Sequence, residues 1–251
     1  MSSQQMYRND VPLRLCREVL AYLTALRRPE LDGFISDLIA AVHAAERNDL
    51  PFRSLAVPPT RGLSNLSRAV TRARHDLPLW KEGAAGRRLL DVAASTAGWA
   101  AWTEFYREDE WSRPFVHRFA GGTVVGPSAP WQAEHLIVDL FVYGPDIDYP
   151  AHAHPAEEVY LILGGDAHFR VGKEPEYRRL HPGEVSHHQP DEPHAIRAGS
   201  EAILGVVMYR GDLAGPLWYR DNMEDPEEPR KNPGVVRPEP VEGSTLQRRD
   251  T

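Results

Sequence analysis

Three histidines and one glutamate stand at spacings that could bring four metal ligands together. His152 and His154 are separated by one residue, Glu158 follows four residues later, and His194 lies forty residues beyond His154. Because alternate side chains of a β-strand share a face, His152 and His154 would point the same way. Three imidazoles and a carboxylate suit one divalent transition metal (Fe, Zn, Mn, Ni or Co) and leave coordination positions open for chemistry.

The neighbours of these residues leave two choices open. Glu157 competes with Glu158 as a ligand, but strand alternation turns Glu157 outward when Glu158 faces inward. One of His187 and His188 could face the cavity beside the ligands. The alternative is that both form a solvated pair on a loop before Pro190.

Two tyrosines accompany the candidate ligands. Tyr149 precedes His152 by three residues, and Tyr160 follows Glu158 by two, so Tyr160 should share the inward face of the same strand. The ordinary pKa of a tyrosine is about 10, and a nearby dication favours the phenolate, which can act as a base. The alternative is a tyrosine that only packs in the core with its hydroxyl hydrogen-bonded.

The first hundred residues are expected to be helical. Apolar residues recur at three- and four-residue spacing, which predicts helices over residues 13–26, 31–45, 63–77 and 89–105. Pro29 would end the first of them.

The pattern changes near Pro114. Short apolar runs punctuated by Gly, Pro and Asp are typical of an antiparallel sandwich or barrel. Gly164-Gly165-Asp166 reads as a hairpin turn between two strands. The sequence therefore predicts a helical region over residues 1–110, a metal-binding barrel over 111–215, and a tail rich in proline and charge over 216–251.

Charge and composition exclude some partners. The net charge of −7 argues against nucleic acid, because binding phosphates needs a basic surface. The single cysteine, Cys16, suits a reducing cytoplasm and reads as a buried structural thiol. No apolar run approaches the roughly 20 residues that span a bilayer, so no membrane association is expected.

The ligand spacing resembles the two-part cupin motif, with Gly165 seven residues after Glu158 and His194 eleven residues after Gly183. Together with Tyr149, Tyr160 and the pair Gly211-Asp212, the stretch from about residue 102 to 212 resembles the cupin family of dimethylsulfoniopropionate lyases. This resemblance implies a mostly β fold, a cupin (double-stranded β-helix or jelly-roll) barrel, preceded here by α-helices. It also implies that His152, His154, Glu158 and His194 hold the metal and that Tyr160 is the base.

The same resemblance implies a substrate, which is a small zwitterion or carboxylate. Its β-elimination would release dimethyl sulfide and acrylate. The sulfonium cation would favour aromatic faces, and the candidates are Trp131, Tyr149, Tyr209 and Trp218. Tyr149 could instead assist the base. A homodimer is possible.

Two other functions fit the same barrel. The fold hosts many reactions, so a metalloenzyme acting on another small carboxylate, as a dioxygenase or an isomerase, is an alternative. A non-catalytic barrel that binds a small molecule is the other.

Overall fold

Four helices stand before the barrel in the computed structural model, which describes residues 3–47, 49, 55–56, 60–98, 100–215, 217–219, 230–231 and 239–240. The α-helices within these residues are α1 (Ser3–Leu26), α2 (Asp32–Glu46), α3 (Leu66–His75) and α4 (Gly83–Thr96). Short 3₁₀ helices cover Pro29–Leu31, Arg61–Asn65, Leu77–Leu79 and Val116–Arg118. Among the described residues, no helix combines the length and the hydrophobicity that crossing a bilayer requires.

The prediction of a helix over residues 89–105 is wrong in its second half. Helix α4 ends at Thr96, and Ala101–Thr103 form strand β2. The indole N–H of Trp102 donates to the carbonyl of Ala97 at 2.7 Å, which holds the reversal of the chain between the two elements. Alanine-rich sequence favours a helix locally, but pairing with β3 outweighs that preference here.

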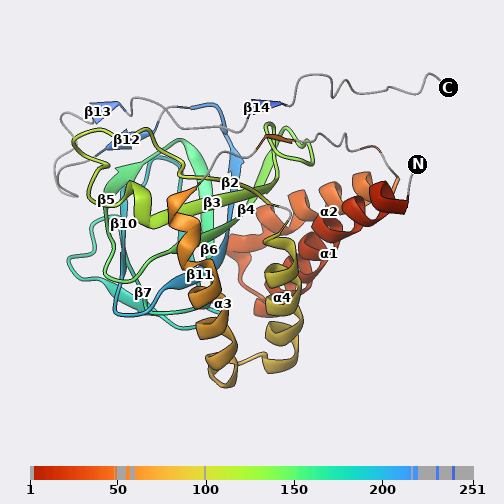
Figure 1. Ribbon diagram of the computed structural model, residues 1–251, viewed down its shortest axis with the longest axis horizontal. Coiled ribbons are helices and arrows are strands. Elements are labelled where there is room, and N and C mark those ends of the chain that lie inside the picture. The colour runs from red at the N-terminus through yellow and green to blue at the C-terminus, as the bar shows by residue number, and fades with distance from the viewer. Residues whose placement is uncertain are drawn as a thin grey trace.

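The strands form two antiparallel sheets, each with six strands in the part of the chain that the structure describes (Figure 1). One sheet has the order β2-β3-β4-β11-β6-β9 and the other β13-β12-β5-β10-β7-β8. The first comprises β2 (Ala101–Thr103), β3 (Phe119–Val125), β4 (Leu136–Tyr143), β6 (Ala156–Gly164), β9 (Val185–His188) and β11 (Ile203–Gly211). The second comprises β5 (Asp148–Ala153), β7 (Ala167–Val171), β8 (Arg178–Leu180), β10 (His194–Ala198), β12 (Trp218–Tyr219) and β13 (Arg230–Lys231).

The predicted fold class, a cupin-type β barrel preceded by helices, is confirmed. A separate short pair joins β1 (Leu55–Ala56) to β14 (Glu239–Pro240). Strand β2 belongs to the barrel sheet although its residues lie within the region 1–110. Most of the predicted tail, 216–251, lies outside the described residues.

The turn at Gly164-Gly165-Asp166 is not a hairpin, because β6 and β7 belong to different sheets. Gly165 has a φ of +104°, which favours glycine, and its N–H donates to the buried Asp76 carboxylate at 3.0 Å. Gly164 packs directly on α3, since a Cβ there would lie 2.3 Å from the Cα of Ala73. The turn therefore carries the chain from one sheet to the other and docks it on a helix.

Two cores lie on either side of the first sheet. The helices and the outer face of this sheet share one large apolar cluster, which includes Cys16, Leu23, Leu38 and Leu90. The second cluster lies between the sheets and is rich in aromatic residues, among them Phe115, Phe119, Tyr149 and Tyr160. The site described below is built at the edge of this aromatic interior.

Strand register places the polar residues of the interior in two adjacent rows, because directly paired residues of antiparallel strands share a face. One row runs across four strands as Ile137, Tyr209, Glu158 and His188. The next row runs across five strands as Thr123, Asp139, Val207, Tyr160 and Ser186. Glu158 and Tyr160 thus face the same interior.

Candidate metal centre and substrate pocket

Three histidine rings have their orientation fixed by the main chain. In each ring Nδ1–H donates to a carbonyl oxygen two residues away: His152 to Pro150 at 3.0 Å, His154 to Ala156 at 2.9 Å, and His194 to Glu192 at 3.0 Å. A neutral imidazole that donates through Nδ1 carries its lone pair on Nε2. All three rings therefore offer Nε2 as a metal ligand, and this kind of outer hydrogen bond is typical of metal-binding histidines.

Glu158 lies between two of these lone pairs. Its Oε2 is 3.4 Å from Nε2 of His154 and 3.0 Å from Nε2 of His194. Burial alone would raise the pKa of Glu158, but His194 and His154 hold it well below its usual range. Burial lowers the pKa of His154, but the charge of Glu158 outweighs this effect and the net shift is upward. The surroundings thus favour a carboxylate at Glu158 and positive charge beside it.

The polar atoms of this group fit a bound metal ion. The ligand atoms of His154, Glu158 and His194 all lie within 4.8 Å of one another, so the three residues could hold one ion. Among the described residues, Oε1 of Glu158 and Nε2 of His194 are buried without a hydrogen-bond partner. A buried polar atom without a partner costs about 1–3 kcal/mol. A cation bound by these atoms would remove that cost.

His152 lies against this group but outside its most compact part. Its ring centroid is 4.0 Å from that of His194 and 6.3 Å from that of His154. Burial, together with His194, holds the pKa of His152 well below its usual value, so the ring is neutral. Its role as a fourth ligand stays a prediction.

Of the two histidines in question before Pro190, His188 faces the interior. It is fully buried, and its Nδ1–H donates to Oε2 of Glu158 at 2.8 Å while its Nε2 accepts from the hydroxyl of Ser186 at 2.9 Å. Burial, with a smaller effect of His194, lowers the pKa of His188 to about 3, so this ring is neutral.

Glu157 and His187 face the other way. Their side chains pair at 2.8 Å, and Arg210 links Glu157, at 2.6 Å, to Asp37 of α2, at 2.8 Å. The side chain of Glu157 thus joins the sheet to helix α2, whereas the side chain of Glu158 faces the interior.

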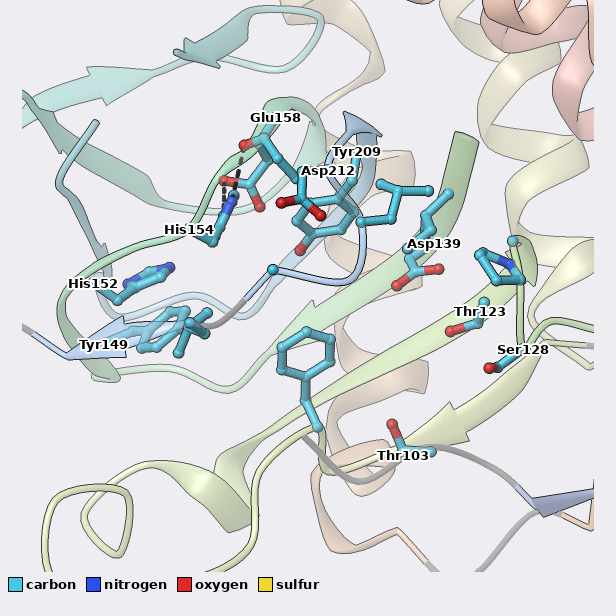
Figure 2. A pocket seen from close by; sticks show the side chains of 18 residues that line it. Thr103, Thr123, Ser128, Asp139, Tyr149, His152, His154, Glu158, Tyr209 and Asp212 are labelled. Atoms are coloured by element: carbon cyan, nitrogen blue, oxygen red, sulfur yellow. Dashed lines mark hydrogen bonds and ion pairs between the residues drawn. The ribbon is translucent and has the colours of Figure 1, made fainter. Parts of the chain in front are cut away.

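A cavity of about 140 Å³ opens beside His152, His154 and Glu158. For scale, a cavity of about 150 Å³ holds a molecule of the size of benzene. Figure 2 shows His154, Glu158 and Tyr209 at one part of its wall and Asp139, Thr123 and Ser128 at another. Phe105 and Tyr149 also line it. Phe105 has a φ of +66°, a strained conformation for a residue other than glycine, and such strain is frequent at functional sites.

Tyr160 lines a smaller cavity next to the first. This cavity measures about 20 Å³, enough for one water molecule. It shares Phe105, Asp139, Tyr149 and Tyr209 with the larger one. The pKa of Tyr160 is raised well above its usual value, first by burial and then by the charge of Glu158. Its hydroxyl lies 3.5 Å from that of Tyr143.

Two of the four residues expected to bind substrate line the pocket and two do not. The ring of Tyr149 stacks on His152, with centroids 4.2 Å apart, and its hydroxyl is hydrogen-bonded to Tyr106. Burial raises the pKa of Tyr149 well above its usual value. The ring of Tyr209 lies 5.6 Å from that of His154.

Trp131 is buried in the core shared with the helices, 4% exposed, and is not among the residues that line the pocket. Trp218 pairs with Ala153 on β5. Alternation along β5 places Ala153 on the face opposite to His152. Trp218 also lies outside the described lining of the pocket.

Sequence reasoning missed Asp139, a buried carboxylate in the middle of an apolar strand. Burial raises its pKa to about 7, while a hydrogen bond from Thr123 acts in the opposite direction. The signal was present in Leu136-Ile137-Val138-Asp139-Leu140, where one acidic residue interrupts an apolar run at an inward position.

Comparison with known proteins agrees with the predicted resemblance. A family model described as dimethylsulfoniopropionate lyase matches residues 70–204. Over 125 residues the chain is 33% identical to the dimethylsulfoniopropionate lyase DddQ of Ruegeria pomeroyi. This aligned segment covers 50% of the chain but only 62% of that relative, which is less than two thirds of its length.

Two solved structures share the fold. The crystal structure of the DMSP lyase DddQ from Ruegeria pomeroyi DSS-3 is 26% identical and superposes with a TM-score of 0.58, covering 81% of this chain and 94% of its own. A structure from work on the DMSP lyases RdDddP and RnDddQII, at 23% identity, gives a TM-score of 0.62 over 85% of this chain and 100% of its own. Since the family model spans more than half of the 251 residues, the chain belongs to the dimethylsulfoniopropionate lyase family.

Proposed function

We propose that this protein is a metal-dependent lyase that cleaves dimethylsulfoniopropionate to dimethyl sulfide and acrylate. The observation that carries the proposal is the buried group of His154, Glu158 and His194, of which His154 and Glu158 line a small pocket, with Tyr160 on the same face of β6 as Glu158. Family membership supports the substrate.

The residues that would hold the metal are His154, Glu158 and His194, with His152 as the proposed fourth ligand. Their nitrogen and oxygen atoms suit Fe, Zn, Mn, Ni or Co. When bound, such an ion would supply Lewis acidity toward the carboxylate of the substrate and so make the α-hydrogen more acidic. The chain contributes the fixed Nε2 lone pairs and a small pocket beside His152, His154 and Glu158.

Tyr160 is the proposed base. Its phenolate oxygen takes the proton from the α-carbon, the electron pair of that C–H bond forms the new C=C bond, and the bond between the β-carbon and sulfur breaks with its pair going to sulfur. Burial and the negative charge of Glu158 oppose the phenolate. A cation bound by Glu158 would offset the effect of its negative charge on Tyr160. The strength of the base would therefore depend on the metal ligands. Tyr149 and Tyr209 would pack against the substrate from the pocket wall.

The test is a headspace assay of dimethyl sulfide on protein loaded separately with each candidate metal. Tyr160→Phe should lower kcat by about 10²–10⁴-fold, the usual contribution of a general base, while the metal content by mass spectrometry stays unchanged. Tyr177→Phe is the matched control, because Tyr177 lies outside both cavities and contacts Arg197 instead. No dimethyl sulfide with any metal would refute the activity, and full turnover in Tyr160→Phe would refute the base.

A further inference from the structure

Asp139 is a buried acid outside the group formed by His154, Glu158 and His194, which is called the metal group below. It lies on β4, is 3% exposed, and lines both cavities. Thr123, its direct partner on β3, hydrogen-bonds to the carboxylate. In the part of the chain that the structure describes, Oδ1 of Asp139 is buried without a hydrogen-bond partner.

The charges around the pocket leave Asp139 without compensation. The lining residues include three carboxylates, Glu158, Asp139 and Asp212, and within the described lining there is no lysine or arginine. Glu158 faces the histidines, and Asp212 is exposed and accepts a hydrogen bond from the N–H of Ala214 at 3.2 Å. A buried charge without a partner is unfavourable. The negative charge of Glu158 adds to the effect of burial at Asp139. The arrangement favours a ligand that brings positive charge.

The pocket has the right dimensions for a ligand with charge at both ends. Asp139 and Glu158 stand in adjacent rows of the inner face, two strands apart. From a strand spacing of about 4.8 Å and a rise of about 3.4 Å per residue, their Cα atoms are roughly 12 Å apart. Because both side chains extend inward, a molecule of a few carbon atoms would fit between the carboxylate and the metal group. Phe105, Tyr149 and Tyr209 line the same pocket.

We propose that the carboxylate of Asp139 binds the cationic end of a zwitterionic substrate whose own carboxylate lies at the metal group. The inference rests on the proposed function and adds to it a residue that recognises the positive charge. The aromatic rings give such a cation apolar and cation–π contacts, whereas the carboxylate of Asp139 provides the negative charge that distinguishes the cation from a neutral group of the same shape.

A pair of isosteric ligands tests this proposal. The ligands 3-(trimethylammonio)propanoate and 4,4-dimethylpentanoate have the same shape and the same carboxylate, and they differ in one positive charge. Titration calorimetry on the metal-loaded protein should show the cationic ligand binding at least about tenfold more tightly, which corresponds to about 1.4 kcal/mol. In Asp139→Asn this ratio should fall to near one, while the affinity for the neutral ligand stays the same or rises.

The control variant is Glu134→Gln, which removes one negative charge from an exposed residue five positions earlier. It should keep the wild-type ratio. An equal affinity of the wild-type protein for both ligands, no binding of either, or an unchanged ratio in Asp139→Asn would each overturn the proposal. The first of these measurements needs no variant, so it stands even if Asp139→Asn does not fold.

Kinetics separate binding from proton transfer. With dimethylsulfoniopropionate, Asp139→Asn should raise KM by about tenfold and change kcat by less than about threefold. A large fall in kcat at constant KM would overturn the proposal and make Asp139 a proton-transfer group. If the wild-type protein prefers the cationic ligand and Asp139→Asn loses that preference, but no dimethyl sulfide is released, only the proposed function is refuted. If dimethyl sulfide is released but the wild-type protein shows no preference for the cationic ligand, only the role of Asp139 is refuted.

Discussion

Glu158 needs a partner that fixes its orientation, and His188 is that partner. The neutral ring donates to Oε2 of Glu158 and is itself held by the hydroxyl of Ser186. When a hydrogen bond to a metal ligand is lost by mutation, the affinity for the metal typically falls by about 10–100-fold. His188 would thus act on a bound metal through the carboxylate, without being one of the grouped candidate ligands.

We therefore expect His188→Ala to weaken metal binding by about 10–100-fold. His187→Ala is the matched control, because His187 pairs with Glu157 outside the metal group, and its effect should stay below about threefold. Competition with a chromogenic chelator gives both dissociation constants. Equal losses in the two variants would mean that His188 does not position Glu158.

Asp139 should make the stability of the metal-free protein depend on pH. Burial raises its pKa to about 7, against about 3.9 in an unfolded chain, so the folded state binds its proton more tightly. Stability from this group is therefore complete below pH 4 and is lost as the pH rises toward 7. Replacing Asp139 with Asn removes this loss. The stability gained by Asp139→Asn should be larger at pH 8 than at pH 5 by roughly 2–3 kcal/mol.

Thermal unfolding at the two pH values measures this difference as a gain in Tm of several degrees. Glu134→Gln, on an exposed residue, should show no such dependence. A Tm difference that does not change between pH 5 and pH 8 would contradict a raised pKa at the buried carboxylate of Asp139.

Strand alternation was enough to separate Glu158 from Glu157, because the inward and outward directions follow from position alone. It could not choose between His187 and His188, since that choice depends on the register of β9 against β6. It also could not exclude Trp131 or Trp218, whose surroundings are set by contacts between distant segments. Asp139 was missed because a single acid in an apolar strand indicates a functional residue only when the pocket beside it is known.

At the scale of elements, α3 holds the crossover between the two sheets. Ala73 touches Gly164, and the buried carboxylate of Asp76 accepts the N–H of Gly165 while pairing with Arg72 at 2.9 Å. The same crossover joins β6, which carries Glu158 and Tyr160, to β7, the neighbour of His194. The helix thus stabilises the segment on which the site is built.

Gly164→Ala should lower the free energy of unfolding by about 1–3 kcal/mol, because the added methyl group would push α3 away from the sheet. Gly83→Ala is the control, since no atom lies within 4 Å of the added Cβ, and it should change stability by less than about 1 kcal/mol. Urea unfolding measures both. A neutral Gly164→Ala would show that α3 is free to move from the sheet.

The errors at this scale have one physical cause. Residues 97–105 have helical propensity, and Gly164-Gly165 has the composition of a hairpin turn. Both predictions used local preference, whereas the structure follows pairing between segments far apart in the sequence. The barrel itself was predictable because its alternating strands and punctuating glycines repeat the same signal many times.

At the scale of the whole molecule, the helices and the barrel share one core. Cys16 of α1 belongs to the cluster that also contains residues of β4, β6 and β11. Its side chain is 1% exposed, and burial raises the pKa of the thiol to about 12. The helical region should therefore unfold together with the barrel. The possible homodimer stays a prediction.

Cys16 provides the measurement. A thiol-specific reagent should leave it unmodified in the native protein, because reaction needs an exposed thiolate. Across a urea titration, its labelling should coincide with the loss of barrel structure followed by near-ultraviolet circular dichroism. Labelling at a urea concentration where the barrel signal is intact would show that the helices unfold separately.

The main-chain hydrogen bonds of the three histidines have a consequence for how such a protein can change over time. Each ring takes its direction from a carbonyl oxygen two residues away. Every amino acid supplies that oxygen, so replacement of the neighbouring side chain does not remove it. A lineage can therefore exchange most of the residues around the three rings, and drift toward new substrates, while the directions of the Nε2 lone pairs are inherited intact.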